Sequence, residues 1–365
     1  MLGFCDYFAG SSSGGIERAT AEVYRRLSER GARMMVVSIV PGERDELVEV
    51  GGIDTRVVPG TDLSPLIGAQ LTISARILGV AERVIGDFAP DVLHASGLHF
   101  AGSAAAAILA RRHDIPLVTT GHVASPAALS LPIRTAVAAY EQVIGRRILR
   151  RSCRVIAVSA AVAAHLRRLG ADNPAVVHNG VDRDRFAPAS RTEDPHVVFV
   201  GRLIANKGPD AALAAFGAVQ YPGARLTFVG DGPMRRSLEE AAQRIGPDIR
   251  FMGNIGDVAP VLNEADILIR PSQTEGQSLA ILEAMAAGVC VLATDISAHR
   301  ELLDGGRCGE LAIPGDRMDL AVRLRRLLQD EASRRRIASA ARQRAAAYTW
   351  EECAAGTGLA LSGAA

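Results

Sequence analysis

The segment from Ile267 to Thr294, ILIRPSQTEGQSLAILEAMAAGVCVLAT, contains a complete strand–helix–strand pattern. The apolar run Ile267–Arg270 predicts one strand, and Val289–Ala293 predicts another. Between them, the apolar residues of Ser278–Ala287 recur at helical spacing. Neighbouring strands joined through a helix run parallel. The segment therefore predicts an α/β fold built on a parallel sheet.

The same alternation extends along the rest of the chain. In the first half we predict strands at Leu2–Phe8, Arg33–Val40, Asp91–His94, Pro116–Thr120 and Val155–Val158, and helices at Glu17–Glu29, Ser103–Arg112 and Ala136–Arg151. In the second half we predict strands at His196–Val200, Ala224–Val229 and Ile249–Met252, helices at Asp210–Val219 and Met234–Ile245, and a helical region at Asp319–Tyr348. The polar, proline-containing segment Val176–Pro195 between the halves is typical of a linker.

The length of the chain favours two domains. Its 365 residues exceed what one hydrophobic core usually serves. We predict two doubly wound, Rossmann-like domains that face a central cleft, one of residues 1–180 and one of residues 181–348.

Composition excludes several classes of protein. Lys and Arg total 41 against 40 for Asp and Glu, and aromatic residues are 4%, so nucleic acid is not an expected partner. Five scattered cysteines without a Cys-x-x-Cys pair argue against a disulfide framework or a zinc site. The N-terminal segment lacks a signal-peptide pattern, and no apolar run reaches about 20 residues. We therefore expect a cytoplasmic protein.

The chain contains a single lysine, Lys207, among its 41 basic residues. In a sequence otherwise limited to arginine, this lysine marks a position where a compact ammonium suits better than a planar guanidinium. Chance placement is the alternative, and the surroundings of the residue decide between the two.

Lys207 lies in the loop VGRLIANKGP, which follows the strand His196–Val200. Gly201 permits a tight turn, and Arg202 and Lys207 place two cations before the next helix. A helix N-terminus adds a partial charge of about +0.5. Together these groups are suited to binding a diphosphate.

A second loop, FVGDGPMRRSLE, follows the strand Ala224–Val229. Gly230 and Gly232 allow a ligand to approach the backbone. A Gly-Asp-Gly turn is common, however, so taken alone these glycines indicate loop geometry.

A third loop carries two carboxylates, Glu275 and Glu283, eight residues apart. On one ideal helix this spacing would leave them about 80° apart, so both could face a single ligand. The backbone amides at the expected helix start would be available to phosphate oxygens, and carboxylates are strong acceptors for sugar hydroxyls. The amides in question belong to Gly276, Gln277, Ser278 and Leu279.

The first half has two candidate positions. The loop GSSSGGIERATAE places Gly14 and Gly15 at a helix entry, but it lacks the Gly-x-Gly-x-x-Gly pattern, which disfavours dinucleotide binding. His122 follows the strand Pro116–Thr120, at the sheet edge where ligands bind. A lone histidine is often structural, but its position at this edge favours a functional role.

Six segments together carry a family resemblance. They are GGIERATAEVYRRLSERG, VIAVSAAVAAHL, VVHNGVD, VGRLIANKG, FVGDGP and TEGQSLAILEAMAAGVCVLATD. In this order, and over nearly the whole chain, they resemble the retaining GT-B glycosyltransferases of family 4. The most specific feature is the Glu275-to-Glu283 spacing combined with Arg202 and Lys207.

The resemblance implies roles for the second-half residues. Arg202 and Lys207 match residues that hold the donor diphosphate. Glu275 matches the carboxylate that contacts donor-sugar hydroxyls, and Glu283 matches the one that contacts ribose.

For the first half, the resemblance implies that His122 lies near the donor sugar and β-phosphate, and that Gly15 belongs to the glycine loop near the diphosphate and acceptor. It also implies that the C-terminal helix, residues 349–365, returns to the first domain.

The implied activity is transfer of a hexosyl unit from a nucleotide diphosphate sugar, such as a UDP- or GDP-sugar, to a hydroxyl group, with retention and without a metal. Many family members have Phe-Gly where this chain has Gln277 and Ser278, so the identity of the sugar stays open. A GT-B nucleotide-sugar 2-epimerase and a non-catalytic nucleotide-sugar-binding protein are the alternatives.

The acceptor also stays open between a lipid-linked glycan, a small sugar and a natural product. The segment YEQVIGRRILRRSCR is rich in arginine and apolar residues. It is compatible with peripheral contact with an anionic membrane or with a solvated helix face.

Overall fold

The computed structural model describes residues 1–10, 14–42, 44–64, 71–124, 131–187, 194–246 and 248–364. The chain divides into two compact units. Unit 1 comprises Met1–Asn179 and Trp350–Ala365, and unit 2 comprises Gly180–Thr349. Among the helices in the described ranges, none is long and apolar enough to cross a membrane.

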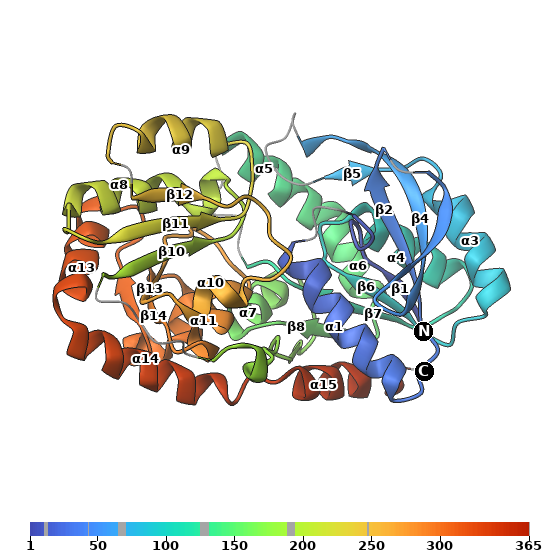
Figure 1. The fold of residues 1–365 in the computed structure, drawn as a ribbon. Coiled ribbons are helices and arrows are strands. Elements are labelled where there is room, and N and C mark those ends of the chain that lie inside the picture. Colours follow the sequence, from blue (N-terminus) through green and yellow to red (C-terminus); the bar gives the residue numbers. More distant parts are fainter. Residues whose placement is uncertain are drawn as a thin grey trace. The chain divides into compact units, whose positions relative to one another are not determined.

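Unit 1 is organised around a mainly parallel sheet (Figure 1). Its strands are β1 (Leu2–Phe4), β2 (Met35–Pro41), β3 (Glu46–Val50), β4 (Ile53–Asp62), β5 (Thr72–Ile73), β6 (Leu93–Ser96), β7 (Leu117–Gly121), β8 (Arg154–Ala157) and β9 (Ala175–Val176). They lie in the order β3-β4-β2-β1-β6-β7-β8-β9, and β5 pairs with β4. The central strands β1, β6 and β7 are fully buried, as expected for a sheet covered on both faces.

Helices cover this sheet. They are α1 (Gly15–Glu29), α3 (Ile77–Phe88), α4 (Ala101–Arg112), α5 (Leu131–Tyr140), α6 (Arg146–Arg151), α7 (Ala160–Arg168) and α15 (Trp350–Ser362). The C-terminal helix α15 packs beside α1 (Figure 1).

The structure corrects several sequence predictions in unit 1. Strand β1 ends at Phe4 rather than Phe8, and Tyr7 turns the chain with a φ of 62°. Strands β3 and β5 pair antiparallel to β4 and were not predicted, because β3 is a largely exposed strand with little apolar patterning. The predicted loop Gly10–Gly15 ends at Gly14, and its residues 11–13 lie outside the described residues.

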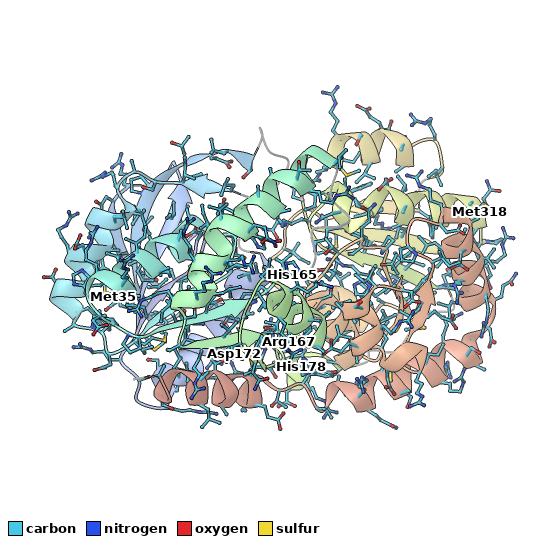
Figure 2. The ribbon with its side chains drawn as sticks, turned by 180° about the vertical axis from the view of Figure 1, so that it is seen from behind. Met35, His165, Arg167, Asp172, His178 and Met318 are labelled. Carbon is cyan, nitrogen blue, oxygen red and sulfur yellow. The ribbon has the colours of Figure 1, made fainter. Side chains whose placement is uncertain are left out.

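The helix predicted at Ala136–Arg151 is divided by a π-helical segment, Glu141–Gly145, between α5 and α6. Glu141 is buried, and its Oε1 lies 2.8 Å from His99 Nε2 and 2.9 Å from His165 Nε2. His165 is on α7, as Figure 2 shows, so the carboxylate joins neighbouring elements of unit 1.

Unit 2 contains a sheet whose pairings are all parallel among its described strands. The strands are β10 (His196–Val200), β11 (Arg225–Val229), β12 (Ile249–Phe251), β13 (Ile267–Arg270), β14 (Cys290–Thr294) and β15 (Glu310–Ala312). Their order is β12-β11-β10-β13-β14-β15. The chain order reverses between β10 and β13, which is the switch point where doubly wound sheets bind ligands.

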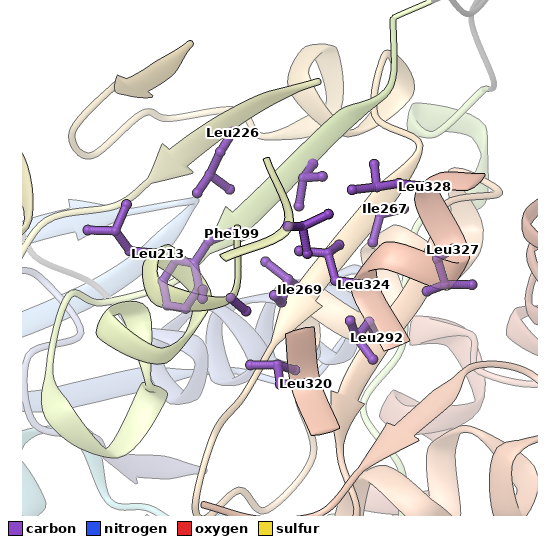
Figure 3. Packing of buried hydrophobic residues seen from close by; sticks show 14 of the residues in the cluster. Phe199, Leu213, Leu226, Ile267, Ile269, Leu292, Leu320, Leu324, Leu327 and Leu328 are labelled. Carbon is purple, nitrogen blue, oxygen red and sulfur yellow. The ribbon is translucent and has the colours of Figure 1, made fainter. Parts of the chain in front are cut away.

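The helices of unit 2 are α8 (Pro209–Val219), α9 (Arg235–Ala242), α10 (Ala259–Asn263), α11 (Leu279–Ala286), α12 (Ser297–Leu302), α13 (Arg317–Gln329) and α14 (Glu331–Ala345). The core joins the sheet to helices, with Phe199, Ile269 and Leu292 from strands packing in one cluster with Leu324 of α13 (Figure 3).

The predicted α/β fold class is confirmed, and strands His196–Val200 and Ile267–Arg270 have the predicted bounds. The predicted helical region Asp319–Tyr348 is two helices, because the side chain of Asp330 caps the second by accepting from the Ser333 amide. The predicted linker contains the 3-10 turn Arg183–Arg185, and its residues 188–193 lie outside the described residues.

Candidate active site

The loops that follow β10 and β13 meet beside the switch point of unit 2. The first contains the 3-10 turn Ala205–Lys207, and the second runs from Pro271 to Ser278. A backbone hydrogen bond of 2.8 Å from the Gln273 amide to the Asn206 carbonyl joins them. Strand order therefore brings together residues that are far apart in the sequence.

Three charged side chains form a chain of ion pairs here. Lys207 Nζ lies 2.8 Å from Glu275 Oε2, and Arg270 Nη2 lies 2.7 Å from Glu275 Oε1. The side chains of Lys207, Glu275 and Arg270 are 15%, 8% and 5% exposed. We call this set the Lys207–Glu275–Arg270 triad. One carboxylate is thus held at both oxygens in a poorly solvated position.

Burial and charge act in opposite directions on the triad. Burial would raise the pKa of Glu275, but Lys207 and Arg270 hold that pKa well below its usual range. Burial lowers the pKa of Lys207 to about 8, although Glu275 opposes this shift. Glu275 is therefore a carboxylate at neutral pH, and Lys207 keeps its proton through most of the physiological range.

Arg270 is a site residue that the sequence analysis missed. Its Nη1 donates to the carbonyl of Val200 at 2.5 Å, and its guanidinium lies 5.6 Å from the ring centroid of Phe199. A Cβ at Gly201 would collide with that guanidinium, so the glycine leaves space for Arg270. The available signal was an arginine at the end of an otherwise apolar, buried strand.

Arg202 differs from Lys207. It is exposed and lies outside the triad, but its charge acts on Lys207 and lowers the pKa of the ammonium. We predicted both cations before the next helix. Lys207 directly precedes the α8 N-cap, Gly208, and its ammonium contacts Glu275 of the neighbouring loop.

The start of α11 also differs from the prediction. The helix begins at Leu279 with Ser278 at its N-cap, so Gly276 and Gln277 belong to the preceding turn. Glu275 precedes the helix, as the predicted helix bounds Ser278–Ala287 imply, so the 80° angle for two residues on one helix does not apply to it. Glu283 lies on α11 and is buried, 5% exposed, rather than a surface residue.

Gly230 and Gly232 are required by packing within unit 2. Gly230 has a φ of 125°, and a Cβ there would clash with the carbonyl of Gly201. A Cβ at Gly232 would lie 2.6 Å from the carbonyl oxygen of Leu203. The turn after β11 thus packs closely against the turn after β10. This packing is enough to explain why both positions are glycine, so a ligand-binding role is not needed to explain them.

Other buried polar atoms lie in and beside the β13–α11 loop. In the described part of the chain, Ser272 Oγ, Ser278 Oγ and His299 Nε2 have no hydrogen-bond partner. His299 is fully buried, its Nδ1 lies 2.9 Å from the Thr294 carbonyl oxygen, and its charge state acts on Glu275. Since buried polar groups normally have partners, these atoms suit a polar ligand.

His122 and Gly15 are in unit 1. His122 follows β7, and its Nε2 lies 3.0 Å from Ser96 Oγ, which lies 2.7 Å from Thr20 Oγ1. Thr20 donates its proton to the Ile16 carbonyl, so Ser96 donates to Thr20 and accepts from His122 Nε2–H. Burial lowers the pKa of His122 to about 4. This histidine is therefore neutral at pH 7, with its acceptor lone pair on Nδ1.

The residues around His122 line a small pocket inside unit 1 whose accessible surface is mostly apolar. Its volume of about 20 Å³ is enough for one water molecule. His94 lines it and contacts Tyr24 and Thr120, and burial lowers the pKa of His94 to about 3. Gly15 is the exposed first residue of α1, and the preceding Gly14 amide donates to Glu17 Oε2 at 2.7 Å.

Two family models match the chain. Residues 13–185 match the model described as Glycosyltransferase Family 4, and residues 194–330 match the model described as Glycosyl transferases group 1. The two matches lie mainly in unit 1 and in unit 2, respectively.

Curated relatives and solved structures agree with these models. The chain is 31% identical to a glycogen synthase of Mycobacterium tuberculosis over 73% of this chain and 67% of that protein. It is 32% identical to a phosphatidyl-myo-inositol mannosyltransferase from the same species over 73% and 71%.

Among solved structures, a sucrose-phosphate synthase from Thermosynechococcus elongatus has a TM-score of 0.80 at 21% identity, over 98% of this chain and 96% of that chain. Anabaena Alr3699/HepE in complex with UDP-glucose also has a TM-score of 0.80, at 19% identity, over 99% of each chain. These matches, with two doubly wound units in one chain, show that the protein belongs to glycosyltransferase family 4 and has the GT-B fold.

Proposed function

We propose that this protein is a retaining hexosyltransferase that moves a sugar from a nucleotide diphosphate to a hydroxyl acceptor. The observation that carries the proposal is the Lys207–Glu275–Arg270 triad at the switch point of unit 2. It combines a cation suited to a diphosphate with a carboxylate suited to sugar hydroxyls. The UDP-glucose complex of the HepE neighbour and the mannosyltransferase relative support a nucleotide-sugar donor.

The reaction requires positive charge beside the departing diphosphate. As the glycosyl–phosphate bond breaks, negative charge grows on the departing diphosphate, and fixed positive partners stabilise it. Lys207 and the exposed Arg202 supply two such partners, and the amides of the α11 N-terminus supply a third. We propose that these groups act in place of a metal ion.

In this proposal, Glu275 binds the hydroxyl groups of the donor sugar. Each carboxylate oxygen can accept more than one hydrogen bond, so Glu275 can accept from sugar hydroxyls while it keeps its ion pairs. Glu283, buried on α11, is assigned to the ribose hydroxyls.

His122 and Gly15 are the unit 1 contributions. A neutral His122 avoids an extra charge near the sugar, and its Nδ1 can accept from a sugar hydroxyl. Gly15, exposed at the start of α1, lets a phosphate or acceptor approach the backbone.

The proposed chemical step is a front-face displacement. The bond between the anomeric carbon and the β-phosphate oxygen breaks, and a bond to the acceptor oxygen forms on the same face. The acceptor proton passes to the departing phosphate oxygen. Retention at the anomeric carbon follows, and no protein nucleophile takes part.

A nucleotide-sugar screen tests the proposal. Saturation-transfer NMR with UDP-, GDP- and ADP-linked glucose, mannose and N-acetylglucosamine identifies the donor, and proton couplings of the product give its anomeric configuration. Conversion of the donor without any acceptor would identify an epimerase instead. Binding without turnover in the presence of a broad acceptor panel would support a non-catalytic binding protein.

The acceptor is a hydroxyl compound, and the arginine-rich segment bears on its class. Arg151 donates to the Ala110 carbonyl and Arg146 to Gln142, whereas Arg147, Arg150 and Arg154 are exposed. Sedimentation with phosphatidylglycerol vesicles, compared with phosphatidylcholine vesicles, tests peripheral membrane contact. Binding to the anionic vesicles alone would favour a lipid-linked acceptor over a soluble sugar or natural product.

A further inference from the structure

Arg270 differs from the other cations of the site in what it can reach. Its side chain is 5% exposed, and two of its three guanidinium nitrogens are already bound to protein groups of unit 2. Nη1 is bound to the Val200 carbonyl at 2.5 Å and Nη2 to Glu275 Oε1 at 2.7 Å. The guanidinium therefore connects the β10 backbone to Glu275.

The surroundings of Arg270 keep it in this position. The ring of Phe199 lies under the guanidinium, with a distance of 5.6 Å to the centroid. Gly201, with a φ of 148°, provides the space that a side chain would fill. A planar guanidinium can make both hydrogen bonds at once through different nitrogens. A lysine ammonium on its flexible stem would hold the two acceptors in a less fixed geometry.

Lys207, in contrast, has two roles in the proposed reaction: it pairs with Glu275, and it binds the donor diphosphate. It is the more exposed cation of the triad, and its ammonium carries three donors. A bound diphosphate would share those donors, so the ion pair of Lys207 with Glu275 Oε2 would persist but be weaker. A buried carboxylate left with a weakened partner would be drawn toward its neutral form and would be free to rotate.

We propose that Arg270 is a positioning residue of the donor site, which holds the Glu275 carboxylate in place through Oε1 while Lys207 serves the donor diphosphate. This rests on the proposed function. In this proposal Arg270 touches neither donor nor acceptor and acts mainly through Glu275. Its charge also lowers the pKa of Lys207. Among the described residues, the charged and titratable groups with the largest effects on Glu275 are Lys207, Arg270 and His299.

The test compares Arg270→Met, which removes the charge, with Arg270→Lys, which keeps it. Arg236→Met is the matched control, because Arg236 lies on α9 with its side chain 92% exposed.

The readout is kcat/KM against pH, with the donor found in the nucleotide-sugar screen. In Arg270→Met we expect a loss of at least about 10-fold at neutral pH and an acid limb moved upward by about one pH unit or more, the scale on which one charge partner moves a carboxyl. Arg270→Lys should restore most of this loss, and Arg236→Met should match the parent protein.

Two results would overturn the proposal. One is a parent-like rate and pH profile in Arg270→Met. The other is an equal loss at every pH that Arg270→Lys does not relieve, since that indicates a purely structural role.

A second measurement does not depend on activity. Urea unfolding from pH 7.5 to 3.5 is compared for the parent, Arg270→Met, Glu275→Gln and the double variant. A carboxyl with a lowered folded pKa stabilises the protein above its unfolded pKa, and this contribution declines as pH falls below about 4.5. The stability lost in Arg270→Met should therefore shrink below about pH 4.5, where Lys207 is fully protonated, and over that acidic range it should not depend on pH in the Glu275→Gln background. A pH-independent loss in both backgrounds would refute the coupling between Arg270 and Glu275.

If no nucleotide sugar binds the parent protein, the proposed function fails. The unfolding measurements still decide whether Arg270 holds the Glu275 carboxylate.

Discussion

Lys207 and Glu275 are 68 positions apart in the sequence, yet the lysine ammonium lies 2.8 Å from the glutamate carboxylate. The contact exists because β10 and β13 are neighbours in the sheet of unit 2, so that the loops after them meet. The only lysine of the chain and a carboxylate of the β13–α11 loop thereby share one poorly solvated position.

Lys207→Ala should reduce kcat by about 100-fold or more, because it removes a fixed charge beside the departing diphosphate. The fold should persist, since Glu275 keeps its ion pair with Arg270. Steady-state kinetics with circular dichroism as a check on folding provide the measurement. Turnover close to that of the parent would remove Lys207 from the mechanism.

Glu275→Gln should lower both activity and stability. The substitution leaves Arg270 and Lys207, with side chains only 5% and 15% exposed, without their carboxylate. Removing one partner of a buried ion pair costs about 3–5 kcal/mol, and the residual exposure of Lys207 places the expected loss toward the lower end. Urea denaturation measures it, with Glu240→Gln on the surface of α9 as control. A change below about 0.5 kcal/mol would show that the triad contributes little to stability.

Gly230→Ala should destabilise unit 2 by more than about 1 kcal/mol, because the new Cβ would meet the Gly201 carbonyl at a φ of 125°. Gly256→Ala is the matched control, since a Cβ there meets nothing within 4 Å. Thermal denaturation of the two variants gives the comparison. Equal midpoints would contradict the assigned packing role.

Acidification should weaken unit 1 through Glu141. Burial would raise the pKa of this carboxyl, but hydrogen bonds from His165 and His99 lower it to about 2. Its contribution to stability is therefore complete well above the unfolded pKa of about 4.3 and is lost as pH falls toward about 2. Glu141→Gln should be less stable than the parent at pH 7, and the difference should narrow below about pH 4.5. A constant difference across this range would refute the assignment.

Chelation should leave transfer unchanged. If Lys207, Arg202 and the α11 amides supply the positive charge, treatment with EDTA followed by gel filtration should preserve kcat within about twofold. Loss of activity that Mg²⁺ or Mn²⁺ restores would show that a metal takes part.

Much of the fold could be predicted from sequence because its signal is local. Strands His196–Val200 and Ile267–Arg270 are short, fully apolar or nearly so, and bounded by turn residues. The antiparallel strands β3 and β5 lacked such a signal, because an exposed strand needs little apolar patterning. The π-helical segment Glu141–Gly145 begins with a buried carboxylate that contacts His99 and His165, and no local sequence pattern encodes those contacts.

The candidate site also combines features that the sequence predicts with features that only the tertiary structure shows. Sequence alone determined that a unique lysine and a glutamate stand in loops at the ends of strands, since residue type and strand periodicity are properties of short segments. Only the tertiary structure decided that Lys207 pairs with Glu275, that Arg270 holds the second carboxylate oxygen, and that Gly201 leaves room for the guanidinium. Those contacts follow from the order of strands in the sheet and from the packing between adjacent loops. That order is set by the burial of the whole apolar core, so no segment determines it by itself.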